Sequence, residues 1–353
     1  MSPGGSPPAR RAGGAAAADR VGVGAAPADS AGIRRPADGA RWSSARIRRL
    51  RPARAGVAPD RALAHAWETE RRASGGERRA LTVFLAGAEC PFTCLFCDLW
   101  RHTLETPTAP GAIPAQLARA LEEAGPAPGG SALKLYNASN FFDRRAVPPA
   151  DDARIAALCR GFERVTVECH PRLLGERAER FGEAIDGRLE VAMGLETVHP
   201  DVFPRLNKGM TREDFDDAVA WARERRLGTR AFVLIGLPWV PAVEFASWAA
   251  ASAGHAARLG VDRVSLIPLR PGNGALDALA RGGELEPVRL EHVEDALAGA
   301  LAAAGPRTVV EADPWDLERL ATCADCGPRR IERLRWANLA QTAPPPVPCA
   351  CRE

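Results

Sequence analysis

The feature that most limits the fold of this chain is a regular alternation of short apolar runs with amphipathic stretches, which starts at Leu81. The apolar and β-branched runs predict strands at residues 81–86, 132–137, 164–169, 189–195, 230–235 and 263–267. Helical spacing predicts helices at residues 113–124, 151–159, 176–185, 212–226, 242–259 and 290–304. Such alternation builds right-handed βαβ units and a parallel sheet. The sequence therefore predicts an α/β fold in which six units curl into a partial (βα)6 barrel of the TIM type.

Length and composition exclude several classes of protein. A chain of 353 residues is long enough for one large barrel with extensions. The formal net charge of +3 gives no global field that would demand a nucleic-acid partner. The sequence has no apolar run long enough for a membrane span and no apolar leader, so we expect a cytoplasmic protein with no membrane partner.

The two ends of the chain differ from the middle. Residues 1–58 are rich in Ala, Gly, Pro and Arg without hydrophobic periodicity, which predicts a disordered basic arm. A role in contacting RNA phosphates is the alternative to a simple tail. We expect the barrel to span residues 76–305 and a Cys-rich, metal-binding extension to span residues 306–353.

Three cysteines follow the first predicted strand within one short loop. Cys90, Cys94 and Cys97 have the spacing Cys-x3-Cys-x2-Cys, with Phe96 just before the last cysteine. Three thiolates on one loop can hold three irons of a [4Fe–4S] cluster and leave the fourth iron open. An open coordination position is typical of a catalytic metal site. A zinc knuckle completed by His102 is the alternative, and the preceding strand favours the cluster.

This motif resembles the cluster-binding loop of the radical S-adenosylmethionine enzymes. The resemblance implies that Cys90, Cys94 and Cys97 bind a catalytic [4Fe–4S] cluster, whose open iron binds the methionine part of S-adenosylmethionine, with Phe96 beside the cofactor. It also implies cleavage of that cofactor to a 5′-deoxyadenosyl radical, which takes hydrogen from a substrate. A flavodoxin- or ferredoxin-type protein would then be the external electron donor. The resemblance implies the same (βα)6 core.

Polar clusters follow the other five predicted strands. They lie at residues 136–140, 168–171, 194–197, 236–239 and 268–274. Active sites of parallel barrels lie at the carboxyl ends of the strands, so all five clusters should face one mouth together with the cysteine loop.

The resemblance implies cofactor contacts for five residues in or near these clusters. Asn137 and Ser139 occupy the place of the family's Gly-Gly-Glu-like segment and can accept a hydrogen bond from the cofactor's amino group. Glu168 and Glu196 can bind ribose hydroxyls or an ammonium, with a salt bridge to an arginine as the alternative. Lys208 can pair with the methionine carboxylate or a substrate phosphate.

Lysine and tyrosine are rare in this chain. Of 47 Lys and Arg residues only Lys134 and Lys208 are lysine, and Tyr136 is the single tyrosine. All three fall in segments that the motifs single out. This is a weak, independent indication that these positions carry a function.

The strand-end motifs narrow the resemblance. Glu-Cys-His-Pro, Gly-Leu-Glu-Thr, Asn-Lys-Gly-Met-Thr and Pro-Leu-Arg-Pro-Gly-Asn-Gly together resemble the branch that includes the Elongator catalytic subunit. They are more similar still to the radical subunit of archaeosine synthase and its uncharacterised bacterial relatives. Those relatives act on tRNA bases, which implies tRNA as a partner and a nucleobase as substrate; a small metabolite is the second choice.

A second set of cysteines lies near the C-terminus. Cys323 and Cys326 form one pair, and Cys349 and Cys351 form another. Four thiolates in two pairs predict a closed site for zinc or for a second iron–sulfur cluster, with structural zinc slightly favoured. A second cluster would point to a sulfur-inserting enzyme. Zinc without iron would point to a non-catalytic, zinc-stabilised RNA-binding module.

Overall fold

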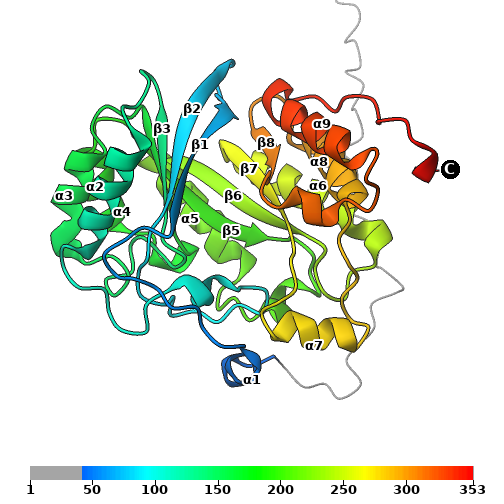
Figure 1. Ribbon diagram of the computed structural model, residues 1–353, viewed down its shortest axis with the longest axis horizontal. Coiled ribbons are helices and arrows are strands. Elements are labelled where there is room, and N and C mark those ends of the chain that lie inside the picture. The colour runs from blue at the N-terminus through cyan, green and yellow to red at the C-terminus, as the bar shows by residue number, and fades with distance from the viewer. Residues whose placement is uncertain (1–41, 353) are drawn as a thin grey trace, which may run out of the picture.

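The computed structural model describes residues 42–352, and in this part of the chain eight strands form one sheet in the order β1 to β8 (Figure 1). The strands are β1 (Ala64–Arg71), β2 (Glu77–Phe84), β3 (Ala132–Tyr136), β4 (Arg164–Glu168), β5 (Arg188–Glu196), β6 (Gly228–Ile235), β7 (Arg263–Pro268) and β8 (Val309–Ala312). The α-helices are α1 (Ser44–Leu50), α2 (Ala112–Ala124), α3 (Asp152–Leu158), α4 (Glu176–Ala184), α5 (Arg212–Glu224), α6 (Phe245–Arg258), α7 (Ala275–Arg281), α8 (Leu290–Ala304) and α9 (Gly327–Ala340). Within the described residues, no helix combines the length and apolarity that a membrane span requires.

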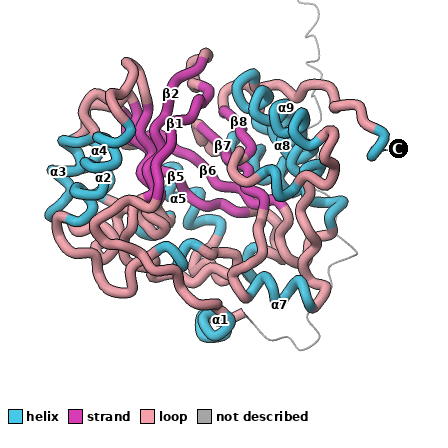
Figure 2. Tube along the Cα trace, viewed as in Figure 1, coloured by secondary structure: helices cyan, strands magenta, loops and turns pink. Residues whose placement is uncertain are grey.

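The partial parallel barrel is confirmed. Strands β2 to β8 pair in parallel, each with its neighbour in sequence, and β1 pairs antiparallel with β2. The six predicted strands correspond to β2 to β7, and the predicted helices correspond to α2 to α6 and α8. Sequence analysis missed β1 and β8 at the two edges of the sheet and the short helices α1 and α7. The curled sheet lies between two groups of helices (Figure 2).

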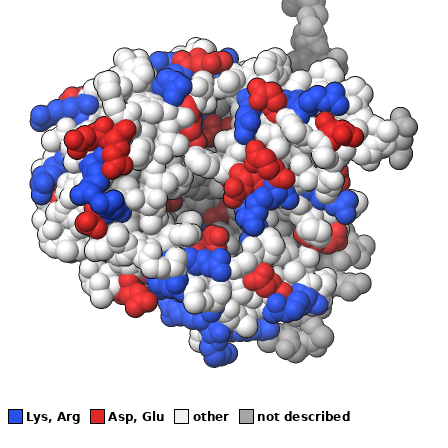
Figure 3. Space-filling view, in the orientation of Figure 1, with Lys and Arg blue, Asp and Glu red and all other residues white. Residues whose placement is uncertain are grey.

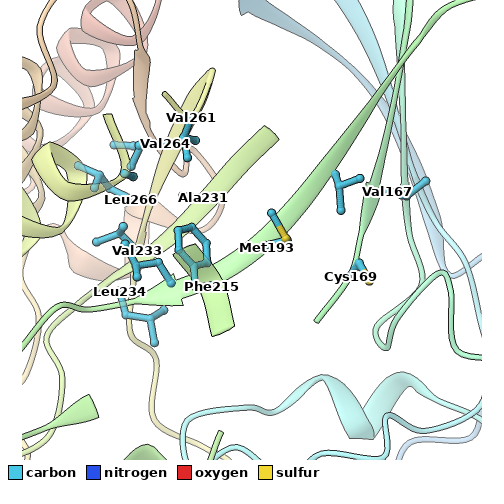
Figure 4. Packing of buried hydrophobic residues seen from close by; sticks show 14 of the residues in the cluster. Val167, Cys169, Met193, Phe215, Ala231, Val233, Leu234, Val261, Val264 and Leu266 are labelled. Carbon is cyan, nitrogen blue, oxygen red and sulfur yellow. The ribbon is translucent and has the colours of Figure 1, made fainter. Parts of the chain in front are cut away.

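The outer face of the sheet forms the hydrophobic core with the helices. Alternate residues of strands β2 to β8 point outward and are buried, among them Met193 on β5 and Val233 on β6, together with Phe215 from α5 (Figure 4). Burying one side chain of this size contributes roughly 1.5–3 kcal/mol. The two-residue repeat of the strands therefore decides which residues face the barrel interior.

The inner face carries charged residues in place of an apolar core. Arg230 of β6 joins Glu190 of β5 (Nε–Oε1 2.9 Å), Glu311 of β8 (Nη1–Oε1 2.6 Å) and Glu70 of β1 (Nη2–Oε2 3.5 Å). Lys134 of β3 joins Glu70 as well, at 3.2 Å. Further members of the network are Glu68, Arg78, Arg164 and Arg263. Strands far apart in the sheet thus meet through ion pairs across the interior.

Helix α9 lies at the opening between the first and last strands. The side-chain amide of Asn338 donates to and accepts from the backbone of Ala312 at 2.8 Å, and Gln341 does the same with Val310. Arg71 of β1 donates to the carbonyl of Leu339 at 3.1 Å. Two side-chain amides therefore satisfy the free edge of β8, where an exposed edge would invite pairing with another chain.

The predicted arm and barrel boundaries need correction. Residues 1–41 lie outside the described part, but residues 42–58, predicted to be disordered, include helix α1, on which Ile47 is buried. Arg51 donates to Glu89 at 2.7 Å, and Arg54 pairs with the same carboxylate. Two arginines of the predicted arm are thus paired with the loop after β2. The sheet also extends on both sides of the predicted 76–305, from Ala64 to Ala312.

Candidate functional site

The cysteine loop follows β2 at the carboxyl end of the parallel strands, where sequence analysis placed it. Two backbone carbonyls of the loop accept hydrogen bonds from residues of distant elements. The amide of Asn207 donates to the Thr93 carbonyl (2.6 Å), and the amide of Asn273 donates to the Leu95 carbonyl (2.8 Å). Helices α1 and α7 lie at this same end of the barrel (Figure 1). The loop is therefore fixed from several sides.

Cys90 is held by a chain of side chains from the next two strand ends. Asn140 donates from Nδ2 to the sulfur of Cys90 at 3.0 Å and accepts at Oδ1 from the backbone N–H of His170 at 2.5 Å. The His170 ring stacks on Phe92 with a centroid distance of 3.6 Å, and its Nε2 lies 3.0 Å from the Lys208 carbonyl oxygen. Burial lowers the pKa of His170 to about 3, so the ring is neutral and positions its neighbours.

The three thiols fit a bound cationic cluster by their chemistry. None of the three forms a disulfide. Burial raises the pKa of all three thiols, that of Cys94 to about 12. The positive charge of Lys208 opposes this rise for Cys90 and Cys94. Metal ligands must be thiolates, so a bound cation has to offset the cost of ionising sulfur here.

Glu196 and Lys208, predicted separately, form one buried ion pair beside this loop. The Lys208 ammonium lies 2.6 Å from Glu196 Oε1, and both side chains are about one-twentieth exposed. Lys208 Nζ lies 5.8 Å from the centre of the Phe96 ring, so three of the six predicted cofactor residues, Phe96, Glu196 and Lys208, are neighbours. A Cβ on Gly194 would lie 1.9 Å from Glu196 Oε1 and 2.5 Å from Lys208 Nζ. The glycine of Gly-Leu-Glu-Thr therefore makes room for the pair.

Four non-glycine residues near the same mouth of the barrel have a left-handed backbone conformation. Ala138 has φ 54°, Glu196 φ 65°, Asn207 φ 50° and Trp239 φ 67°, each at or just after a strand end or in a loop beside it. A register shift in the β5–β6 ladder coincides with Glu196. Non-glycine residues adopt this conformation only where the surrounding structure imposes it, and such strain clusters at functional sites.

Asn137 and Ser139 have the free hydrogen-bonding capacity that a polar ligand would use. Both side-chain atoms of the buried Asn137 amide and the Ser139 hydroxyl find no hydrogen-bond partner among the described residues. Buried polar groups are otherwise nearly always paired. The residues therefore fit the cofactor contact that the resemblance implied for them.

Glu168 accepts hydrogen bonds from the protein backbone, and its contact with ribose hydroxyls or an ammonium stays a prediction. Its Oε1 accepts from the Asn137 N–H at 2.7 Å, and the N–H groups of Ala138 and Ser139 also donate to this carboxyl group. Burial raises the pKa of Glu168 to about 7, against the lowering effect of these donors. The carboxyl group thus holds the 137–139 loop in place.

Glu168→Gln should change how stability depends on pH. Because the folded state binds the Glu168 proton more tightly than the unfolded state, ionisation destabilises the fold progressively from about pH 4.5 to pH 7, by a few kcal/mol at most. The neutral glutamine keeps one oxygen acceptor but cannot ionise, so the variant does not lose stability in this way. Urea unfolding at pH 5 and pH 8 should show the variant gaining stability relative to wild type at the higher pH. An unchanged difference between the two pH values would contradict the assignment.

Aromatic side chains meet across the barrel interior above the charged network. Tyr136 of β3 lies 6.3 Å from Phe232 of β6 and 6.1 Å from Phe84 of β2, measured between ring centres. Phe84 in turn contacts Trp315, which follows β8 and is 42% exposed. Strands β3 and β6 are not sheet neighbours, so these contacts span the interior. The space-filling view is hollowed at the centre of the face it shows (Figure 3).

The four C-terminal cysteines come together as predicted. The sulfurs of Cys323, Cys326, Cys349 and Cys351 all lie within 4.8 Å of one another. The buried Arg330 lies beside them: Glu294 raises its pKa, and Cys326 adds to the rise. Glu294 Oε2 accepts from Arg330 Nε at 3.0 Å.

Sequence analysis did not identify the residues that hold the cysteine loop or the residues that face the barrel interior. Asn140 and Asn273 stood within predicted polar clusters, but nothing in the sequence indicated contact with the cysteine loop. Lys134 and Tyr136 were marked only by the rarity of their residue types. Cys159 and Cys169, the two cysteines outside both sets, are buried.

Comparison with known proteins gives one family match. Residues 86–249 match the family model described as "Radical SAM superfamily". An uncharacterised protein of Methanocaldococcus jannaschii is 24% identical over 149 residues, 41% of each chain.

Solved structures give more distant similarities. Elp3 of Methanocaldococcus infernus is 14% identical, with a TM-score of 0.47 over 64% of this chain and 58% of that one. HydG of Carboxydothermus hydrogenoformans, an FeFe-hydrogenase maturase, is 14% identical, with a TM-score of 0.48 over 72% and 56%. This chain therefore spans less than two thirds of each of these relatives.

Proposed function

We propose that this chain, whose residues 86–249 match the radical S-adenosylmethionine superfamily, is an enzyme that modifies a nucleobase of tRNA, with a [4Fe–4S] cluster on Cys90, Cys94 and Cys97. The observation that carries the proposal is the position of these three unpaired cysteines directly after β2, at the carboxyl edge of the parallel strands. When bound, the cluster and S-adenosylmethionine supply an electron and a 5′-deoxyadenosyl radical that takes hydrogen from substrate.

The chain's own residues prepare the site for that chemistry. Asn140 orients the Cys90 sulfur, and Asn207 and Asn273 fix the loop backbone. Asn137 and Ser139 offer unpaired polar atoms to the cofactor's methionine part. Lys208 places a positive charge next to the thiolates, balanced by Glu196. A flavodoxin- or ferredoxin-type protein supplies the electron from outside.

A planar nucleobase suits the barrel interior. Three strands and the loop after β8 contribute aromatic rings here: Phe84 of β2, Tyr136 of β3, Phe232 of β6 and Trp315. Extruded bases are commonly stacked on aromatic side chains and read by hydrogen bonds at their edges. A small metabolite is the second candidate, and the family match disfavours the non-catalytic RNA-binding module.

The test begins with anaerobic reconstitution using iron and sulfide. Iron per chain and reductant-dependent 5′-deoxyadenosine are measured for the wild type, for the triple Cys90, Cys94, Cys97→Ala variant, and for Cys159→Ala as a matched buried-thiol control. We expect about four irons on these cysteines and 5′-deoxyadenosine formation in the wild type and the control, with both lost in the triple variant. Retained iron and activity in the triple variant would overturn the cysteine assignment.

The substrate is tested separately. Bulk tRNA is incubated with the reconstituted enzyme, hydrolysed to nucleosides and compared by mass with tRNA treated with the triple variant. A nucleoside of changed mass in the wild-type sample alone is the expected result. Cofactor cleavage without any changed nucleoside would reject the tRNA substrate and leave the radical chemistry standing.

A further inference from the structure

The four C-terminal cysteine sulfurs are arranged as the corners of one small polyhedron. Cys323 Sγ lies 3.9 Å from Cys349 Sγ, and Cys326 Sγ lies 3.6 Å from Cys351 Sγ. All four sulfurs lie within 4.8 Å of one another, and all four cysteines are free. These separations exceed a disulfide bond length of about 2.05 Å.

From this geometry we propose that Cys323, Cys326, Cys349 and Cys351 form a closed tetrahedral site for a single zinc ion. A Zn–S bond of about 2.3 Å in a tetrahedron places neighbouring sulfurs about 3.8 Å apart, which matches both measured pairs. An iron–sulfur cubane attaches each thiolate to a different iron, so the body of the cluster separates the sulfurs further. One ion, and not a second cluster, fits between these four side chains.

The surrounding chain is built to bring the two cysteine pairs together. Cys323 and Cys326 lie in the turn that enters α9, where the Gly327 N–H donates to the Cys323 carbonyl at 3.0 Å. The tail after α9 then runs back along the helix, because Arg333 donates to the Pro344 and Pro345 carbonyls at 3.1 and 2.7 Å. This return brings Cys349 and Cys351 to the amino end of α9.

The local charges suit a zinc ion with four thiolates, which has a net charge of −2. The amino end of α9 contributes the positive end of the helix dipole. The Arg330 guanidinium, which is 3% exposed, lies beside Cys326 and is held there by Glu294. Such second-layer groups are what a metal–thiolate site requires.

The proposed ion has a structural role and offers no sulfur for transfer. A four-coordinate zinc ion has no open position and no redox chemistry. Its four ligands join the entry to α9 to the tail, and α9 covers the free edge of β8 through Asn338 and Gln341. The zinc site thus holds α9 at the opening of the barrel. A zinc ion at this site leaves no place for the second iron–sulfur cluster that a sulfur-inserting enzyme would need.

Metal analysis tests this without any activity readout. Zinc and iron per chain are measured for the full-length protein, for Cys326→Ala, and for Cys159→Ala as a buried-thiol control outside the set. We expect about one zinc in the wild type and the control, and none in Cys326→Ala, with cluster iron unchanged. Cobalt(II) in place of zinc should give the visible absorption of a tetrahedral tetrathiolate, absent from the variant. If Cys326→Ala does not fold, the exposed Cys351→Ala replaces it.

Three results would overturn the proposal. Loss of about half of the iron in the variant would indicate a second cluster. One iron in place of zinc would indicate a mononuclear iron site. A metal-free protein in which these four cysteines fail to react with a thiol reagent would indicate two disulfides. None of these results depends on the tRNA proposal, because cofactor cleavage is not measured.

Discussion

Replacing Lys208 with methionine is expected to cost roughly 3–5 kcal/mol of stability and to abolish cofactor cleavage. The variant leaves the Glu196 carboxylate buried without the ammonium that lies 2.6 Å away. It also removes the positive charge that lowers the pKa of the Cys90 and Cys94 thiols. Urea unfolding gives the first effect, and iron content together with 5′-deoxyadenosine formation gives the second.

Two further variants separate folding from function at this position. Lys208→Met combined with Glu196→Gln removes both charges and should recover most of the lost stability while cofactor cleavage stays absent. Lys134→Met removes the other lysine, which pairs with Glu68 and Glu70 inside the barrel, and should lower stability while iron loading persists. Full activity in the double variant would contradict a role for Lys208 in the site.

Replacing Arg230 with methionine should also destabilise the fold by roughly 3–5 kcal/mol near neutral pH. Arg230 is 2% exposed and is the common partner of Glu70, Glu190 and Glu311, all of them on other strands. Methionine fills much of the volume but leaves these three carboxylates without their shared cation. Urea unfolding measures the difference from wild type.

The pH dependence of this difference identifies its electrostatic origin. Burial alone would raise the pKa values of Glu190 and Glu311, but Arg230 and other cations hold both below their usual range. The stabilisation is therefore present above about pH 4.5 and is lost as pH falls through the lower, folded-state pKa values. The difference in the free energy of unfolding between wild type and Arg230→Met should therefore become smaller at acidic pH. A constant gap would point to lost packing instead.

A surface pair provides the matched control. Arg225 lies 3.2 Å from Glu179, and the two side chains are 30% and 39% exposed. Water screens such a pair, so Arg225→Met should change stability by less than about 1 kcal/mol. A large loss there would mean that removing an arginine is costly wherever it lies, and the network argument would fail.

The strands and helices that could be predicted are those with a local hydrophobic pattern in the sequence. The runs that became β2 to β7 are buried on their outer face, so their apolar residues recur with the strand period and the strand positions follow within a few residues. Strand β1 was missed because its inward residues, such as Glu68 and Glu70, are charged and pair with cations on other strands. Helix α1 was missed because its segment is rich in arginine, and arginine patterns do not reveal that Glu89 will pair with Arg51 and Arg54.

The sequence by itself determined the parallel sheet, the order of its strands, the cysteine loop at a strand end and the C-terminal cysteine set. These follow from short-range spacing, which the two-residue period of strands and the spacing of ligands on one loop translate directly into structure. Only the tertiary structure decided that Glu196 pairs with Lys208, that Glu168 holds backbone, and that four C-terminal sulfurs lie within 4.8 Å. Partners far apart in the chain meet only when the barrel closes, and burial then makes their pairing obligatory.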